Sequence, residues 1–437
     1  MIKGFSRLSK EEKQALILNQ IKKQGAFNLF QQSNLADKDM HQLIEQFSEN
    51  VISIFPFPYS IVPNFLIDNK DYLVPFVTEE SSVVAAAAKS AGFWYTHGGF
   101  RCEIIGNQKK GHVHFKTSVP AKLLFRKIES WTPQILTSVE AINQKMASRG
   151  GGIQAINLVD KTSQIENYFQ IEVGFNTCNA MGANYMNSCL ENIAHELTLQ
   201  MADDKDLRGF TFEVIMSILS NYSPDNAVKV WVECPVEALS EDKLEQSAKA
   251  FANRFVEAVE IAQADVSRAV THNKGIFNGI DSVALATGND WRAIEANGHA
   301  YASRSGQYRS LSQAWISDSM FRFEAVFPMQ VGTVGGITSL HPLAKLSLEI
   351  LDNPTAEELM KVMAAAGLAS NYAAVRALVT SGIQKGHMKM HLSNLLASLQ
   401  ASNEERQKAE EFFKEKTISY SVVNDFIFEL RKGVNSN

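Results

Sequence analysis

The chain has 437 residues, of which 45% are hydrophobic and 20% charged, so it can bury a large core in two or three domains. The formal net charge of -5 provides no broad basic field, which argues against nucleic acid as a partner. The N-terminal residues become charged at once, and no uninterrupted run of about 18 apolar residues follows. We therefore expect a cytoplasmic protein without a membrane segment.

The first eighty residues predict two helices and a strand. Ser9 and Glu12 form a capping box, so a helix should begin there and stop at Gly25. A second apolar stripe at helical spacing runs from Met40 to Val51. Prolines at alternate positions then exclude helix, and an apolar strand is expected from Tyr72 to Val77.

Two adjacent glutamates, Glu79 and Glu80, lie between this strand and an alanine-rich helix predicted from Ser82 to Tyr95. The end of a strand often displays catalytic side chains on the following loop. The same carboxylates could instead only favour the N-terminus of the helix through its dipole. The local pattern alone favours this second, structural interpretation.

Strands and helices alternate in a new order between about Gly106 and Tyr222. Strands are expected at His112 to Lys116, Ile153 to Val159, Tyr168 to Phe175 and Phe210 to Leu219, and helices at Ala121 to Trp131, Leu136 to Ser148 and Ala183 to Met201. This β-α-β-β-α-β order describes a ferredoxin-like unit. Gly150 to Gly152 follow the second helix, either as its C-cap or as a place where backbone meets phosphate.

The second half of the chain is mainly helical. Alternating valines from Val228 to Val232 predict a strand, and Phe321 to Met329 predicts another. A long helical stretch should run from Ser240 to Arg268, and a further helix should cover Asp290 to Ser305. Beyond these, helices dominate, with a break expected at Gly367 and caps expected at Thr355/Glu358 and Ser402/Glu405. The last fifty or so residues look like a small helical appendage.

The stretch from Thr271 to Trp291 gathers polar residues among glycines. Lys274 and Asp290 lie sixteen positions apart, and each is expected on a turn rich in glycine and asparagine. A charged pair in a tight site needs such an arrangement. A plain connection between core elements would look the same, so the composition leaves both interpretations open.

Several motifs taken together resemble the 3-hydroxy-3-methylglutaryl-coenzyme A (HMG-CoA) reductase family. In chain order they are ENVI from Glu49, NFLIDNKDYLVPFVTEESSVVAAA from Asn64, THNKGIFNG, ATGNDWRAIEA, VGTVGG and IQKGHM. The likeness is to the soluble bacterial branch, class II, and extends from about Glu49 to His391 in the family's order. Several independent motifs at matching separations make a chance resemblance a poor explanation.

The resemblance implies an α+β fold with a large mixed domain, an inserted ferredoxin-like cofactor domain and a helical C-terminal flap. The expected boundaries are 1–105 and 223–381 for the two parts of the large domain, 106–222 for the inserted NAD(P)-binding domain and 382–437 for the flap. The family is also dimeric, so we expect a homodimer with shared active sites, while higher oligomers stay open.

The resemblance also assigns residues to the site. The catalytic groups it implies are Glu80, Lys274, Asp290 and His387. The substrate-binding positions it implies are Ser82, Arg268, Asn278 and Asn221. The chemistry explains why these residue types are needed. The preplaced ammonium of Lys274 stabilises the negative charge that each hydride addition puts on oxygen. Asp290 would keep Lys274 protonated and, as a like charge, would favour the protonated form of Glu80, which could then donate a proton. His387, on the flap, would protonate the released CoA thiolate.

Cofactor binding is assigned in the same way. The positions implied are Asn143, Lys145, Arg149, Met181, Gly182 and Asn184. The family's signature reads approximately DAMGAN, and here Asn179 replaces the acid. Relatives that use NADH place an acid a few residues before the glycine triplet, where this chain has Asn143 with basic residues nearby. A neutral amide with basic neighbours favours a 2′-phosphate, so we expect NADPH, with NADH as the alternative.

The implied activity is reductive deacylation of HMG-CoA to mevalonate and CoA with two NADPH, in isoprenoid biosynthesis. The alternative within the enzyme class is an NADH-linked enzyme that oxidises mevalonate in its catabolism. An alternative outside the enzymes is a non-catalytic acyl-CoA-binding or scaffold protein that kept the fold. The four retained catalytic residues argue against it, since a binding protein has no need of a thiolate acid on a flap. No metal is implied, because the His387/His391 pair lacks the glutamate of a zinc motif.

Overall fold

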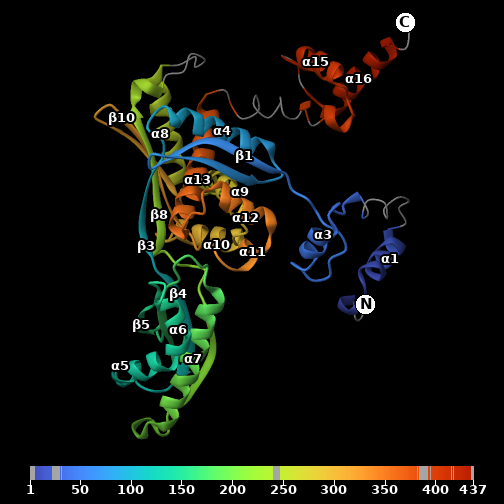
Figure 1. Ribbon diagram of the computed structural model, residues 1–437. Coiled ribbons are helices and arrows are strands. Elements are labelled where there is room, and N and C mark those ends of the chain that lie inside the picture. The colour runs from blue at the N-terminus through green and yellow to red at the C-terminus, as the bar shows by residue number, and fades with distance from the viewer. Residues whose placement is uncertain are drawn as a thin grey trace.

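The computed structural model describes residues 5–21, 30, 32–239, 247–380, 382, 392–393, 395–414, 416 and 418–434. In these ranges the chain forms three antiparallel sheets together with helices, drawn as a ribbon in Figure 1. The expected α+β fold class is confirmed.

Two short helices, α1 (Lys10–Ile21) and α3 (Lys38–Glu45), form the N-terminal segment. The predicted capping box is present, because the Glu12 backbone N–H donates to Ser9 Oγ at 3.1 Å and the Ser9 N–H donates to Glu12 Oε2 at 2.7 Å. Gly25, the predicted stop, lies outside the described residues. The second helix ends earlier than Val51, since the chain turns after Glu45 and Asn50 has a φ of 57°.

The larger part of the fold is built on an antiparallel sheet with the strand order β3-β8-β10-β9. Its strands are β3 (Arg101–Asn107), β8 (Asn226–Pro235), β9 (Ser312–Ser317) and β10 (Met320–Pro328). A separate hairpin, β1 (Tyr59–Ile67) and β2 (Lys70–Val77), packs against α4 (Ser81–Tyr95). The strands and the alanine-rich helix predicted in these regions are confirmed. The pattern missed β1 because a bulge after Val62 and a φ of 65° at Asn64 break its alternation.

Six helices complete this larger part. They are α8 (Ala248–Ala264), α9 (Val266–Ala286), α10 (Trp291–Ala302), α11 (Gly336–Leu340), α12 (Pro342–Ile350) and α13 (Ala356–Val379). The long helical stretch predicted before Arg268 is interrupted at Asp265, which caps α9, and its predicted start at Ser240 lies outside the described residues.

Two expectations about glycine were wrong in this region. Lys274 lies inside α9 rather than on a turn, and α13 continues through Gly367. The reason is that both helices need glycine where they cross. A Cβ on Gly279 would lie 2.2 Å from the Ala366 carbonyl oxygen, and one on Gly367 would lie 2.8 Å from Ile280 Cγ1. These glycines therefore permit close helix packing instead of ending the helices.

Helix α13 lies at the centre of the core. By length and composition it is the one helix of the described residues that could cross a membrane, but 67% of its most apolar window is buried in the protein. It packs against α9, α4 and β8. A core helix can be as long and as apolar as a membrane span. The burial of α13 identifies it as a core helix.

The smaller part is a second antiparallel sheet with the strand order β5-β6-β4-β7. Its elements are β4 (Lys109–Thr117), α5 (Ala121–Ser138), α6 (Glu140–Ala147), β5 (Gly152–Asp160), β6 (Tyr168–Asn176), α7 (Ala183–Asp203) and β7 (Phe212–Leu219). The predicted succession of strands and helices is confirmed, and the strand order is that of a ferredoxin-like unit. The unit has its own apolar core, in which Phe115, Phe169 and Ile193 are buried.

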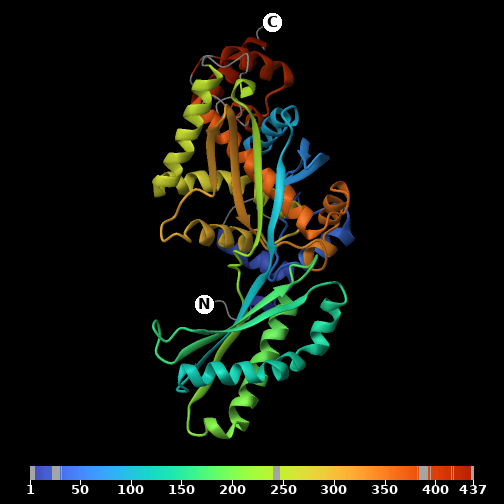
Figure 2. The ribbon, with the colours of Figure 1, turned by 90° about the vertical axis from the view of Figure 1, so that its left-hand side faces the viewer.

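The two parts are joined by two connections that run side by side. β3 is followed almost directly by β4, and residues 220–225 lead back from β7 to β8. A Cβ on Gly106 would lie 2.4 Å from the Asp225 carbonyl oxygen, so the two connections touch. Figures 1 and 2 show the smaller sheet and its helices at one end of the larger part, continuing the direction of β3.

The C-terminal helices α15 (Asn403–Phe412) and α16 (Tyr420–Val434) form a group set apart from the larger part in Figure 1. The predicted capping box at Ser402 and Glu405 is present. The rings of Phe412 and Phe426 stack at 4.4 Å, and an apolar cluster joins the two helices to residues near Leu396. The helical appendage expected from the sequence is confirmed as a structure, while its role as a flap stays a prediction.

Candidate active site

Glu80 faces Lys274 across the gap between α4 and α9. Glu80 is the N-cap residue of α4, but its side chain makes no capping hydrogen bond. Instead Oε1 accepts a hydrogen bond from Ser82 Oγ, and Oε2 lies 3.8 Å from Lys274 Nζ. The lysine side chain is 66% exposed, and an exposed ion pair stabilises a fold by only about 0–1 kcal/mol. The pair therefore fits a role in chemistry better than a structural one.

The position of Lys274 is fixed by the two residues before it, which are buried. His272 Nε2 lies 2.6 Å from Ser312 Oγ, whose proton goes to Asn371 Oδ1, so the histidine is the donor. Asn273 donates to the Arg309 carbonyl at 2.9 Å and accepts from the Leu311 N–H at 2.9 Å. Burial lowers the pKa of His272 to about 3, so its ring stays neutral.

These contacts tie α9 to the residues around β9 and leave Lys274 pointing outward. Sequence reasoning missed His272 and Asn273, although both belong to the motif that contains the lysine. Asn278 lies four residues after Lys274 and therefore on the same helix face. Arg268 is half-buried in the first turn, where its backbone N–H donates to Asp265 at 2.6 Å.

Within one chain Asp290 lies away from this pair, so its expected contact with Lys274 stays a prediction for a site shared by two subunits. It caps α10 by accepting from the Ala293 N–H at 3.2 Å, and its ionic partner in the described chain is Arg292 at 3.1 Å. From Lys274 the helix continues to Ala286, an axial rise of about 18 Å. One chain thus brings Glu80 to Lys274 but does not bring Asp290 to the same point.

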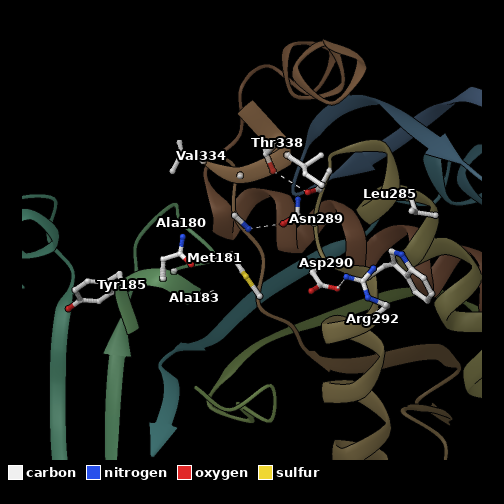
Figure 3. Close-up of a pocket in the computed structure, with 18 of the residues that line it drawn as sticks. Ala180, Met181, Ala183, Tyr185, Leu285, Asn289, Asp290, Arg292, Val334 and Thr338 are labelled. Carbon is white, nitrogen blue, oxygen red and sulfur yellow. Dashed lines mark hydrogen bonds and ion pairs between the residues drawn. The ribbon is translucent and has the colours of Figure 1, made fainter. Parts of the chain in front are cut away.

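Asp290 instead faces a cavity of about 590 Å³ between the larger and smaller parts. The smaller part contributes Met146, Ala180, Met181, Gly182, Ala183, Asn184 and Tyr185, and the larger part contributes residues 288–292 and 334–338 together with Leu285 and Gly332. Figure 3 shows Asp290 and Arg292 on one side of this cavity and Met181 and Ala183 on the other. Its size is that of sites that bind small molecules and cofactors.

The cavity wall from the smaller part ends at the N-terminus of α7. Gly182 is the N-cap, with a φ of 91°, and a Cβ there would lie 2.4 Å from Thr177 Cγ2. The N-terminus of this 21-residue helix presents unpaired backbone N–H groups and the positive end of its dipole. Such an end suits a phosphate group, so Met181, Gly182 and Asn184 lie where a dinucleotide could bind.

Asn179, which stands where the family has an acid, has a structural task. Its Oδ1 accepts from the Ala356 N–H at 2.9 Å at the start of α13, and its carbonyl accepts from the Thr333 N–H at 2.8 Å. Across the cavity, Asn289 Oδ1 accepts from the Gly332 N–H at 2.8 Å. The carbonyl bond attaches the loop before α7 to the glycine-rich loop of the larger part, and the side-chain bond attaches it to α13, where an amide oxygen accepts as a carboxylate would.

The three remaining cofactor candidates lie behind or beside the cavity. Lys145 and Arg149 are exposed at the end of α6 and do not line it. Asn143 Oδ1 accepts from the Ile153 N–H at 3.1 Å and from the Tyr185 hydroxyl at 2.6 Å. Since Tyr185 lines the cavity, Asn143 is one side chain removed from it.

A buried lysine that sequence reasoning missed supports the same loop. Lys109 is 3% exposed, and its ammonium donates to Thr177 Oγ1 at 2.7 Å and to the carbonyls of Ala180 and Met181 at 2.9 and 3.0 Å. Burial lowers the pKa of Lys109 to about 7. The sequence signal was only a pair of adjacent lysines at the start of a strand.

Two candidates receive little support from the geometry. Asn221 is exposed in the connection between β7 and β8 and does not line the cavity. His387 lies outside the described residues, so its assignment stays a prediction. No group of three or more His, Cys, Asp or Glu residues in the described ranges could hold a metal ion.

Asp281 introduces a pH dependence into the packing of α9 against α10. It is mostly buried, its Oδ1 has no hydrogen-bond partner in the described chain, and burial together with the nearby carboxyl group of Glu295 raises its pKa. The folded protein therefore keeps a proton that the unfolded chain releases above about pH 4. Stability must then fall as the pH rises from about 4 until Asp281 ionises in the folded state.

We expect Asp281→Asn to remove this part of the pH dependence. For the wild type, the free energy of unfolding should fall by up to about 1.4 kcal/mol per pH unit in this window, beyond what the variant shows. Denaturant unfolding between pH 5 and 8 at constant ionic strength measures the difference. Asp318→Asn, on an exposed turn, is the control for loss of one charge. Equal slopes for wild type and Asp281→Asn would contradict the expectation.

An acid beside a lysine, with a separate cofactor-sized cavity at a helix N-terminus, is the arrangement of an enzyme rather than of a structural protein. The model of the hydroxymethylglutaryl-coenzyme A reductase family matches residues 10–392. The chain therefore belongs to this family of oxidoreductases.

Individual relatives agree with this assignment. The 3-hydroxy-3-methylglutaryl-coenzyme A reductase of Archaeoglobus fulgidus is 34% identical over 396 residues, which cover 88% of this chain and 84% of the relative. The class II enzyme of Streptococcus pneumoniae, solved bound to NADPH in open conformations, is 36% identical, with a TM-score of 0.71 over 86% of this chain and 99% of that one. A second structure of the Streptococcus pneumoniae reductase covers 98% of this chain with a TM-score of 0.72.

Proposed function

We propose that the protein catalyses the reductive deacylation of HMG-CoA to mevalonate and CoA with two molecules of NADPH. The observation that carries the proposal is Lys274 Nζ at 3.8 Å from Glu80 Oε2 on an open face. Family membership supplies the substrate class. The cavity at the N-terminus of α7, with Gly182 allowing close approach, fits a dinucleotide phosphate, and the bound cofactor would supply hydride.

The residues of this chain would act on the two carbonyl reductions. The Lys274 ammonium stabilises the oxyanion formed when hydride adds to the thioester, and again when it adds to the aldehyde. Glu80 would exchange a proton with the same oxygen, and its hydrogen bond from Ser82 would fix the carboxyl group. His387 would protonate the leaving thiolate, which prevents its return to the aldehyde.

We further propose a homodimer in which Asp290 acts on the Lys274 of the partner subunit. In one chain Lys274 lies within α9 and Asp290 lies beyond the end of α9, at the start of α10, so a single subunit leaves the Glu80 and Lys274 pair without Asp290. A second copy can supply it. We propose the division 1–105, 106–222, 223–381 and 382–437 for the domains, a cytoplasmic location, and the isoprenoid pathway as the context.

NADPH rather than NADH is proposed because of how Asn143 is held. Its Oδ1 is occupied by two donors, so the amide orientation is fixed and Nδ2 is the end left to meet a ligand. An amide donor favours a 2′-phosphate, whereas an acid at this position would repel it. The alternative, an NADH-linked enzyme that oxidises mevalonate, requires the opposite preference.

The test is an absorbance assay of the reduced nicotinamide with HMG-CoA, run with NADPH and NADH and in both directions. We expect turnover with HMG-CoA and a higher kcat/KM for NADPH. No turnover with either cofactor would exclude the proposed function. A strong NADH preference with faster mevalonate oxidation would favour the catabolic alternative.

Asn143→Asp sharpens this test, because the new carboxylate can keep both hydrogen bonds to Oδ1 while replacing the donor with a negative charge. We expect kcat/KM for NADPH to fall by about 10-fold or more, with little change for NADH. The exposed Lys122→Ala variant, on α5 of the same part, is the control for a general loss of positive charge. Equal effects on both cofactors would contradict the assignment.

A further inference from the structure

The most deeply buried cation in the described chain holds the loop that faces the cavity. Lys109 begins β4, and its three hydrogen-bond acceptors are all uncharged oxygens of Thr177, Ala180 and Met181. Three acceptors match the three N–H donors of an ammonium group. Burying a cation without a carboxylate is costly, and a methionine would fill similar space without that cost. The ammonium group therefore has a task in the loop.

The geometry of the peptide bond shows what that task is. In a trans peptide the C=O of one residue and the N–H of the next point in opposite directions. Lys109 draws the carbonyls of Ala180 and Met181 to itself, so the N–H groups of Met181 and Gly182 point away from it. Both residues line the cavity on the other side of the loop. A Cβ on Gly332, which also lines the cavity, would lie 2.4 Å from the Met181 nitrogen, so the Met181 N–H faces Gly332 and the Gly182 N–H is the one left to face the cavity.

The remaining bonds of the loop restrain it against translation. Thr177 Oγ1, which accepts from Lys109, donates to the Ala180 carbonyl at 2.6 Å. Ala180 forms a β-bridge with Val334, and Asn179 Oδ1 accepts from the N–H of Ala356, the first residue of α13. These contacts fix where the loop lies, while Lys109 fixes which way its peptide groups face. A cation on two carbonyls also polarises the attached N–H groups, which strengthens them as donors to an anion.

We propose that Lys109 is a positioning residue for the cofactor, and that its ammonium group, by holding the Met181 carbonyl, orients the Gly182 N–H toward the diphosphate. The inference rests on the proposed function, since it assigns a residue to the binding of the same dinucleotide. Lys109 itself does not touch the ligand in this role. It acts through the backbone of the loop.

The experiment compares ligand binding by the full-length wild type and Lys109→Met. NADPH binding is followed by its fluorescence, and HMG-CoA binding by calorimetry. We expect the Kd for NADPH to rise by about 10- to 100-fold, because the variant loses a set of charge-assisted hydrogen bonds. The Kd for HMG-CoA should stay within about two-fold. The Kd for 2′-phospho-ADP-ribose, which has the diphosphate but no nicotinamide, should rise by the same factor.

Two further variants keep the test decisive. Lys116→Met removes an exposed lysine from the same strand and should leave both Kd values unchanged. Thr177→Val removes one acceptor of the lysine with little change of shape, and should raise the NADPH Kd by about 3- to 10-fold even if Lys109→Met does not fold.

Each outcome bears on one conclusion. Unchanged NADPH binding by Lys109→Met and Thr177→Val, or an equal loss of NADPH and HMG-CoA binding, would overturn the role of Lys109 while the proposed function stands. Failure of the wild type to bind NADPH would overturn both. A selective loss of the two diphosphate ligands supports the inference.

Discussion

Replacing Lys274 with methionine is expected to lower kcat with HMG-CoA and NADPH by about 10²- to 10³-fold or more, because it removes the only ammonium group assigned to the developing oxyanion. The fold should be unaffected. The lysine side chain is 66% exposed, and its ion pair with Glu80 at 3.8 Å contributes little to stability. Steady-state assays, with a thermal melt of the same samples, measure both effects.

The control for this variant is Lys249→Met, which removes an exposed lysine from α8. It should retain wild-type kcat, since it lies on another helix. If the protein were only an acyl-CoA-binding scaffold, neither variant would alter any turnover, because there would be none to lose. Wild-type turnover in the Lys274→Met protein would refute the proposed mechanism while leaving family membership intact.

The sequence predicted the pairing of Glu80 with Lys274 only through the resemblance to the HMG-CoA reductase family. Local pattern favoured a structural role for the glutamates before α4, and only the three-dimensional structure shows that Glu80 makes no capping bond and turns to Lys274. The meeting of residues almost two hundred positions apart depends on packing between α4 and α9. No periodicity in either segment encodes that contact.

Elements with strong local signals were predictable. The capping boxes at Ser9, Thr355 and Ser402 were readable from residue spacing alone and are all present. The strand and helix succession of the smaller part was also predicted, because its apolar runs alternate with helical stretches of ordinary length. Most bounds moved by a few residues, since the ends of elements depend on tertiary contacts, but α5 continues through Pro133 to Ser138, beyond its predicted end at Trp131.

The sequence-based predictions failed where the role of a residue depends on its tertiary contacts. Lys109 reads as an ordinary surface lysine next to Lys110, yet one is buried and the other pairs with Asp225 at 2.9 Å. The sequence also did not show that a continuous helix keeps Asp290 away from Lys274 within one chain. Glycine in the stretch from Thr271 to Trp291 was interpreted as a turn signal, although Gly279 lies where α9 crosses α13.

That crossing gives the largest expected change in stability. Gly279→Ala should destabilise the protein by about 2–4 kcal/mol, because the new methyl group would lie 2.2 Å from the Ala366 carbonyl oxygen and 2.6 Å from Ser370 Oγ. Backbone cannot rotate away as a side chain can, so α9 and α13 must separate. The gain of about 1 kcal/mol in helix propensity from glycine to alanine offsets only part of this cost.

Gly275→Ala is the matched control, because it makes the same change one turn earlier in α9. There the nearest atoms to a Cβ are 3.9 Å away, so alanine should be neutral or should stabilise by up to about 1 kcal/mol. Denaturant unfolding of both variants tests the contrast. If the two had equal effects, α9 and α13 would not be in the close contact described. Because α9 carries Lys274, the Gly279 variant should also lose activity at temperatures where it remains folded, which links the packing of the core directly to the site.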